Sequence, residues 1–147
     1  TLKGWNVGRG SVEDLYWQGV RKAMSLLSDR YGCKAVSDEE FNVYKEKNGI
    51  GHTDAQKEES INTQAWILHL TNPAECWANV RRSGYPQLKS PADYGWGQYL
   101  TGGKEIPVRL CYPVLESSYN KANYDEALDR MGGTDNWHTP VWWDRQK

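Results

Sequence analysis

The chain has 147 residues and a formal net charge of -1, and this size suits one domain. So balanced a charge offers no electrostatic attraction for nucleic acid, which we exclude as a partner. No stretch is both long and apolar enough to be a membrane-spanning helix.

The first two predicted helices come early in the chain. From Ser11 to Tyr31, apolar or small residues recur at the three-and-four spacing of one helix face, and Gly32 follows as a stop. Ser37 and Glu40 form a capping-box pattern that opens a shorter helix, which ends at residues 48–49. The start of the chain is therefore predicted to be a helical hairpin.

Two more helices follow. The third should run from about Asp54 to Leu70, and its expected buried stripe comprises Ile61, Ala65, Trp66, Ile67 and Leu68. The fourth should be capped by Asn72, with Pro73 at the first helical position, and should break at Gly84. Residues 11–84 are thus predicted to form two helical hairpins in succession, as at the end of a helical-repeat array.

The pattern changes in residues 85–147, where prolines punctuate a stretch rich in Gly and Tyr with little periodicity. We expect ordered loops with few short strands. One short helix is predicted near 123–131, capped by Asn123 and stopped at Gly132. The predicted fold class is mainly α, with the helices of residues 11–84 followed by this loop-rich part.

Aromatic residues suggest where a ligand could bind. The chain holds eight Trp and nine Tyr against one Phe, and the polar groups of Trp and Tyr suit half-wet binding surfaces. Tyr94, Trp96 and Tyr99 alternate with glycines in residues 90–105, a pattern typical of an exposed loop. We predict that these three rings stack on a ligand. The alternative, that they anchor the loop to the body, stays open.

The pair Arg81-Arg82 stands at the end of the fourth predicted helix. Two guanidinium groups could clamp a ligand carboxylate or sugar hydroxyls. They could equally complement the helix dipole and hold the carbonyls of a long loop. We favour the structural interpretation for both arginines.

No local pattern points to a metal, a cofactor or catalysis. The three histidines lack zinc-ligand spacing, and no nucleophile motif or phosphate-binding loop is present. Paired carboxylates that converge only in the fold leave a glycan-active enzyme as an alternative. The odd number of cysteines, Cys33, Cys76 and Cys111, argues against a full disulfide framework. One disulfide with a free thiol remains an open arrangement.

Several motifs in register resemble the C-terminal end of SusD/RagB-like outer-membrane lipoproteins. They are Tyr16-Trp17-x-Gly19-Val20, Ile61-x-Thr63-Gln64-x-Trp66, Trp77-x3-Arg81-Arg82-Ser83-Gly84-Tyr85-Pro86-x-Leu88, Ile106-Pro107-x-Arg109, Tyr112-Pro113-x2-Glu116, Asn120-x2-Asn123-Tyr124, Gly132-Gly133-x-Asp135 and Val141-Trp142-Trp143-Asp144. Together they extend over nearly the whole chain, which makes the set far more specific than any one motif.

The resemblance implies a function and a location. It implies a non-enzymatic nutrient-binding protein that passes glycans or peptides to a SusC-like TonB-dependent transporter. The expected location is the surface of the outer membrane. The family fold is helical, with tetratricopeptide-like pairs and a loop-rich C-terminal part. We expect residues 1–147 to be the C-terminal portion of such a protein, whose missing N-terminal part carries the lipid anchor and is itself a partner.

The resemblance also assigns a role to Trp142, Trp143 and Asp144, because in such proteins the Trp-Trp-Asp terminus packs back on the body. An end segment needs burial if it is not to fray. We therefore predict that these three residues are structural anchors. If Trp142 and Trp143 are well buried, replacing either with Ala should cost roughly 3–5 kcal/mol of stability.

Three functions stay in competition. The first is nutrient binding, with either a glycan or a peptide as the ligand. The second is a glycan-active enzyme, which would turn over an oligosaccharide instead of only binding it. The third is a structural or interaction fragment without a ligand site of its own.

Overall fold

The computed structural model describes all residues except 1, 6–7, 9, 96–105 and 145–147. The chain divides into two compact units, residues 1–87 (unit 1) and 88–147 (unit 2), close to the change of pattern at residue 85. The described residues form helices and loops, which confirms the mainly α prediction. The few short strands expected after residue 85 are not found among them.

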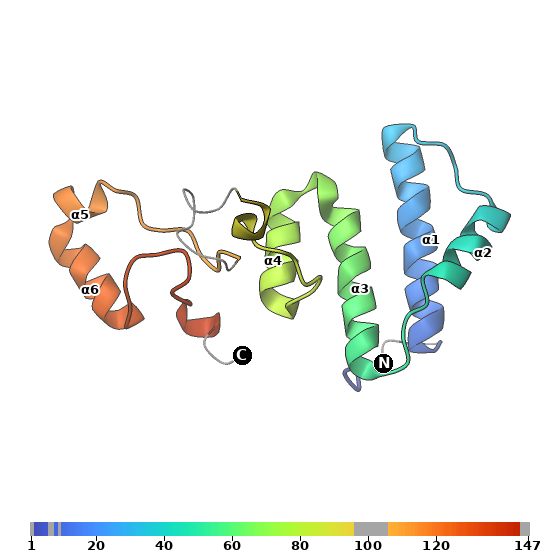
Figure 1. Cartoon of the computed structure of the whole chain (residues 1–147), viewed down its shortest axis with the longest axis horizontal. Coiled ribbons are helices and arrows are strands. Elements are labelled where there is room, and N and C mark those ends of the chain that lie inside the picture. Colours follow the sequence, from blue (N-terminus) through green and yellow to red (C-terminus); the bar gives the residue numbers. More distant parts are fainter. Residues whose placement is uncertain (1, 6–7, 9, 96–105, 145–147) are drawn as a thin grey trace. The chain divides into compact units, whose positions relative to one another are not determined.

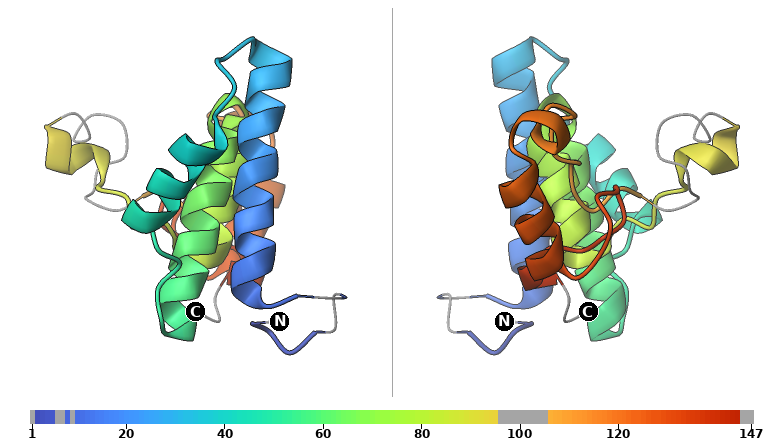
Figure 2. Two further views of the ribbon diagram at one scale, coloured as in Figure 1. Left: turned by 90° about the vertical axis from the view of Figure 1, so that its right-hand side faces the viewer. Right: turned by 90° about the vertical axis from the view of Figure 1, so that its left-hand side faces the viewer.

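Unit 1 contains the four predicted helices (Figure 1). They are α1 (Val12–Tyr31), α2 (Asp38–Lys47), α3 (Asp54–Leu68) and α4 (Pro73–Ser83), with a 3-10 turn, η1 (His69–Thr71), before α4. Helices α1 and α3 run in the same direction, and α4 returns antiparallel to α3 (Figures 1 and 2). Within the described part of the chain, no helix combines the length and the apolar character needed to cross a membrane.

The helix ends follow local signals in the sequence. The predicted capping box at Ser37 is present, because Ser37 N donates to Glu40 Oε2 at 2.9 Å and Glu40 N donates to Ser37 Oγ at 3.2 Å. Helix α4 has the predicted proline at its start, but Asn72 makes no side-chain cap hydrogen bond. Gly32 and Gly84 end α1 and α4 in the left-handed region.

The core of unit 1 lies between α1 and α2. Its buried residues are Tyr16, Trp17, Val20 and Ile50, with Phe41 and Tyr44 of α2 packed against them. Helix α3 is attached to this core by two hydrogen bonds: Gln64 Nε2 donates to Tyr44 OH at 2.8 Å, and Ser60 Oγ donates to the Ile50 carbonyl at 2.9 Å. Helices α1 and α2 therefore pack on this core directly, and α3 contacts it through these two hydrogen bonds.

The buried stripe predicted for α3 is wrong, because no described residue of α3 is fully buried. Ile61 and Ile67 are 36% and 45% exposed. The apolar residues of α3 lie around much of its circumference, so packing on α4 and on the core leaves some of them uncovered. Ile61 instead lines an open groove beside α1.

Replacing Thr53 with Ala should lower stability by about 1 kcal/mol, because Thr53 caps α3. Thr53 Oγ1 accepts from Gln56 N at 3.2 Å, and Gln56 Oε1 accepts from Thr53 N at 3.1 Å. Urea denaturation of the chain measures the change. Thr53→Ser keeps the oxygen and should stay close to the unsubstituted chain, and equal losses in the two variants would contradict a capping role.

Unit 2 is built around one short helical pair. Its elements are η2 (Pro91–Tyr94), α5 (Glu116–Tyr119), α6 (Lys121–Met131) and η3 (Trp142–Asp144). Helix α6 ends at Gly132 as predicted, but it begins before Tyr124, with Asn120 and not Asn123 in the N-cap position. Helix α5 was not predicted, because four residues are too few to show helical periodicity.

Candidate functional site

The predicted aromatic loop begins at η2. Ser90 is buried, and its backbone N and Oγ both donate to Asp93 Oδ2, at 3.0 and 3.2 Å. This contact shapes the turn that ends in Tyr94, whose side chain is 61% exposed. Gly95 follows with φ 77°, a conformation that residues with side chains rarely adopt. Tyr94 thus stands at the surface on a locally held turn.

The predicted ligand-binding residues are only partly described. Tyr94 has the exposure that stacking on a sugar face needs. Trp96 and Tyr99 lie outside the described residues. The assignment of all three to a ligand therefore stays a prediction.

Arg81 and Arg82 lie in the last turn of α4. Arg82 Nη2 donates to Asn79 Oδ1 at 3.0 Å. The Arg81 guanidinium carbon lies 4.8 Å from the centre of the Trp77 ring, at cation–π distance. Both arginines contact side chains of their own helix, and the structural role predicted for them stays a prediction.

Asn79 connects α4 to α3 and to the segment that follows α4. It is 3% exposed, and its Nδ2 donates to the carbonyls of Asn62 at 3.1 Å and Tyr85 at 3.4 Å. Ser83 Oγ donates to the Asn79 carbonyl at 2.7 Å and accepts from Tyr85 N at 3.0 Å. No role was predicted for Asn79, because an isolated polar residue on a helix gives no local signal of burial.

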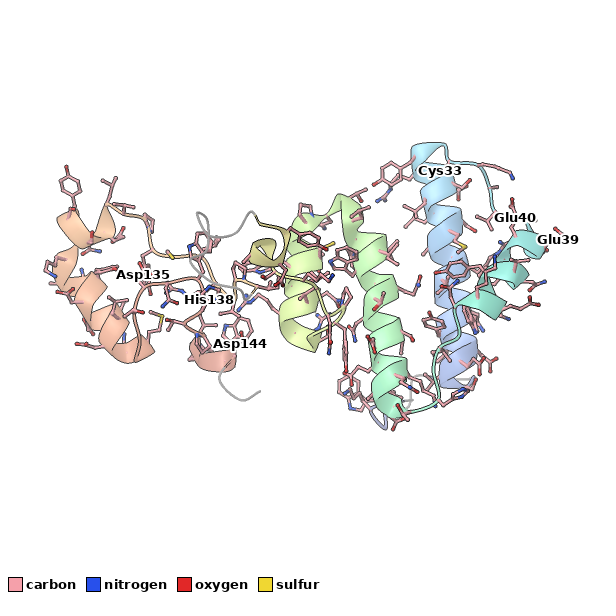
Figure 3. The ribbon with its side chains drawn as sticks, in the orientation of Figure 1. Cys33, Glu39, Glu40, Asp135, His138 and Asp144 are labelled. Carbon is pink, nitrogen blue, oxygen red and sulfur yellow. The ribbon has the colours of Figure 1, made fainter. Side chains whose placement is uncertain are left out.

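A buried ion pair lies in unit 2, between two loop segments. Arg109 Nη1 lies 2.9 Å from Asp135 Oδ1, and the two side chains are only 7% and 12% exposed. Figure 3 labels Asp135 within this unit. Two charges removed from water in this way need good geometry and further hydrogen bonds to be stable. No role was predicted for either residue, although both belong to the motifs quoted above.

Two tyrosines surround this ion pair. Tyr112 N donates to both Asp135 carboxylate oxygens at 3.2 Å, and Tyr124 OH donates to Oδ2 at 3.2 Å. The Arg109 guanidinium carbon lies 5.0 Å from the centre of the Tyr112 ring. Loss of solvation and the hydrogen bond to Asp135 raise the pKa of Tyr124 above its usual value. The cluster therefore holds α6 and the two loops together.

The motif Gly132-Gly133-x-Asp135 has a structural explanation. Gly132 takes φ 67° to end α6. A Cβ on Gly133 would lie 2.7 Å from Thr139 Cγ2, so a side chain there would force a shift. Asn136 Oδ1 accepts from Thr139 N at 2.7 Å and closes the turn. The two glycines thus let the chain turn tightly enough to bring Asp135 beside Arg109.

The burial on which the predicted stability cost of Trp142 and Trp143 depends is not found within this chain. Trp142 is 82% exposed and Trp143 is 53% exposed. A single 3-10 turn directs consecutive side chains about 120° apart, so neighbouring rings cannot both face one surface. Asp144 is half-buried, and its N donates to the Val141 carbonyl at 2.9 Å. An anchoring role for these three residues remains a prediction.

No metal centre is found in the part of the chain that the structure describes, because no three His, Cys, Asp or Glu side chains gather closely enough to hold an ion. All three cysteines are free thiols, with Cys33 exposed and Cys76 and Cys111 half-buried. Cys76 Sγ donates to the His69 carbonyl at 2.9 Å.

Comparisons with known proteins place this geometry in a family. The model of the SusD-like family, described as SusD and RagB outer membrane lipoproteins, matches residues 1–144. No curated protein sequence matches the chain. Among solved structures, the Bacteroidetes AC2a SusD-like protein is 46% identical with a TM-score of 0.83, over 99% of this chain and 27% of its own.

Two further solved structures have a named ligand. A chitin-binding protein is 36% identical with a TM-score of 0.74, over 92% of this chain and 28% of its own. A chitin-binding SusD homologue from Flavobacterium johnsoniae is 26% identical with a TM-score of 0.66, over 99% of this chain and 34% of its own. This chain thus spans about a third or less of the length of these three relatives. It belongs to the SusD-like family of SusD and RagB outer-membrane lipoproteins.

Proposed function

We propose that this chain is the C-terminal portion of a non-enzymatic glycan-binding component of a SusC/SusD-type uptake system. The observation that carries the proposal is the 36% identity to a chitin-binding protein over 92% of the chain. The second chitin-binding relative supports the same ligand class. Of the two ligand classes open from sequence, glycans are therefore favoured over peptides.

The proposed partner and location follow from family membership. A SusC-like TonB-dependent transporter would receive the glycan at the surface of the outer membrane. The remainder of the SusD-like protein, N-terminal to this portion, would carry the lipid anchor. Neither binding nor delivery needs a catalytic residue or a cofactor, so we propose none.

An exposed tyrosine gives the proposal a physical basis. Sugars present C–H faces that pack against aromatic rings, while their hydroxyls seek polar groups. Tyr94 is 61% exposed on a turn held by Ser90 and Asp93, so little backbone entropy needs to be lost when a sugar stacks on it. We propose Tyr94, with Trp96 and Tyr99 beyond it, as the sugar-stacking platform.

Chitin oligosaccharides should bind the chain, and Tyr94→Ala should weaken binding roughly 2- to 12-fold, because one stacking contact contributes about 0.5–1.5 kcal/mol. Isothermal titration calorimetry with chitohexaose measures the change. Tyr119→Ala is the matched control, since Tyr119 is 86% exposed in the same unit and lies outside the proposed platform.

Two outcomes would contradict the proposal. If calorimetry shows saturable binding of mixed peptides but no binding of chitohexaose or other glycans, the chain belongs to a peptide-uptake system. Shorter oligosaccharides appearing after incubation with chitohexaose would favour the glycan-active enzyme. We expect binding without products.

A further inference from the structure

An open groove of about 520 Å³ runs between α1 and α3 in unit 1. Figure 2 shows the two helices side by side. The walls of this α1–α3 groove are formed largely by Leu15, Gly19 and Ala23 of α1 and Ile61, Ala65 and Leu68 of α3. Their three-and-four spacing places each set on one helix face. Two apolar helix faces thus border an open space.

A polar contact borders each end of the groove. Lys3 Nζ lies 2.9 Å from Glu58 Oε1, near the starts of α1 and α3. Tyr31 OH donates to Thr71 Oγ1 at 3.1 Å, at the end of α1 and beyond the end of α3. The helices run in the same direction (Figure 1), and the Tyr31–Thr71 contact joins the end of α1 to the turn that follows α3.

The groove suits an apolar occupant better than a sugar. Two of its polar side chains are already engaged, since Asn62 Nδ2 donates to the Glu58 carbonyl at 2.8 Å and Gln64 Nε2 donates to Tyr44 OH at 2.8 Å. A sugar placed against the remaining apolar walls would lose hydrogen bonds to water without replacing them. Burial of apolar side chains would instead stabilise the occupied state.

Small residues in the middle of the walls favour a helix. Gly19, Ala23 and Ala65 leave room for a backbone to approach closely, while Leu15 and Ile61 form ridges beside them. A Cβ built on Gly19 meets no atom within 4 Å. The open space above Gly19 therefore belongs to the groove and is not filled by the chain itself.

We propose that an amphipathic helix from the rest of a SusD-like protein packs into the α1–α3 groove. The relatives support this occupant, because they match 92–99% of this chain with only 27–34% of their own length. About two thirds or more of such a protein thus lies outside the match and can supply a helix. The inference rests on the proposal that this chain is one portion of a longer protein, and does not depend on glycan binding.

One substitution should have opposite effects in two settings. In the 147-residue chain, Gly19→Met should raise Tm by roughly 2–4 °C, because it removes a helix glycine and covers apolar wall. In a chimera, this chain replaces the matching segment of the 46% identical SusD-like protein. There Gly19→Met should lower Tm, since methionine would collide with the seated helix.

Matched variants control the comparison. Ser25→Met changes an exposed position of α1 outside the groove and should shift Tm little in either setting. Ala65→Met tests the opposite wall and should also lower Tm in the chimera. Circular dichroism confirms that each variant folds.

Three outcomes would overturn the inference. A higher Tm for Gly19→Met in both settings would show that the groove stays open in the longer protein. A chain dimer that Gly19→Met dissociates in analytical ultracentrifugation would make a second copy the occupant. Loss of chitohexaose binding in Gly19→Met would make the groove the glycan site. If no variant binds glycan but Gly19→Met still raises Tm in the chain and lowers Tm in the chimera, only the proposed function is rejected.

Discussion

Asp135→Ala should destabilise unit 2 by about 3–5 kcal/mol, because it leaves the guanidinium of Arg109 buried without its counter-charge. The two side chains are 7% and 12% exposed, so water cannot readily replace the lost carboxylate. The same change removes the acceptor for Tyr112 N and Tyr124 OH. Urea denaturation measures the loss, and amide hydrogen exchange of residues 106–144 shows whether it is confined to unit 2.

Two further variants separate charge from shape. Asp135→Asn keeps an acceptor oxygen but removes the charge, so most of the loss should persist if the ion pair is responsible. Replacing both partners, Arg109→Met with Asp135→Leu, should recover much of the stability, since no unpaired charge stays buried. A double variant as unstable as the sum of the single variants would contradict this account.

The helices of unit 1 could be predicted because their signals are local. A capping box at Ser37 and the three-and-four spacing of α1 involve residues within one or two turns of each other. The start of α6 shows where such signals fail, because Asn120 and Asn123 are both acceptable cap residues. The short α5, which ends at Tyr119 with Asn120 as its C-cap, decides between them.

The ion pair of unit 2 could not be predicted from local signals. Arg109 and Asp135 lie far apart in the sequence, and only the turn at Gly132 and Gly133 brings them together. The resemblance included these positions in its motifs without giving them a role. The ion pair gives these two motif positions a structural role. Of the proposed ligand-binding residues, the structure describes only Tyr94, which is exposed.

The exposure of Trp142 and Trp143 could not be predicted from the sequence either. Trp17 stands in a long amphipathic helix, where periodicity assigns a face to each residue. Trp142 and Trp143 stand in a single 3-10 turn, which has no period long enough to indicate a face. Trp17 and Trp142 are 8% and 82% exposed, although both are tryptophans in helical segments.

Trp17→Ala should cost about 3–5 kcal/mol of stability, because it empties the centre of the aromatic cluster between α1 and α2. The Trp17 ring meets Tyr16, Phe41 and Tyr44 edge-on, with centroids 4.7, 6.1 and 6.5 Å away. Lys45 Nζ lies 5.6 Å from the same ring. Urea denaturation should show a lower midpoint, and Trp17→Phe should keep part of the stability because an aromatic ring remains.

Trp142→Ala is the matched control, since it removes the same side chain from an exposed position. Within the 147-residue chain it should change stability by no more than roughly 0.5 kcal/mol, as expected for a surface substitution. A loss comparable to that of Trp17→Ala would mean that Trp142 is buried in solution, as the resemblance implied. Trp142→Ala can also be measured in the chimera with the 46% identical relative. If it lowers stability there but not in the 147-residue chain, the remainder of a SusD-like protein covers Trp142, which then acts as the predicted anchor.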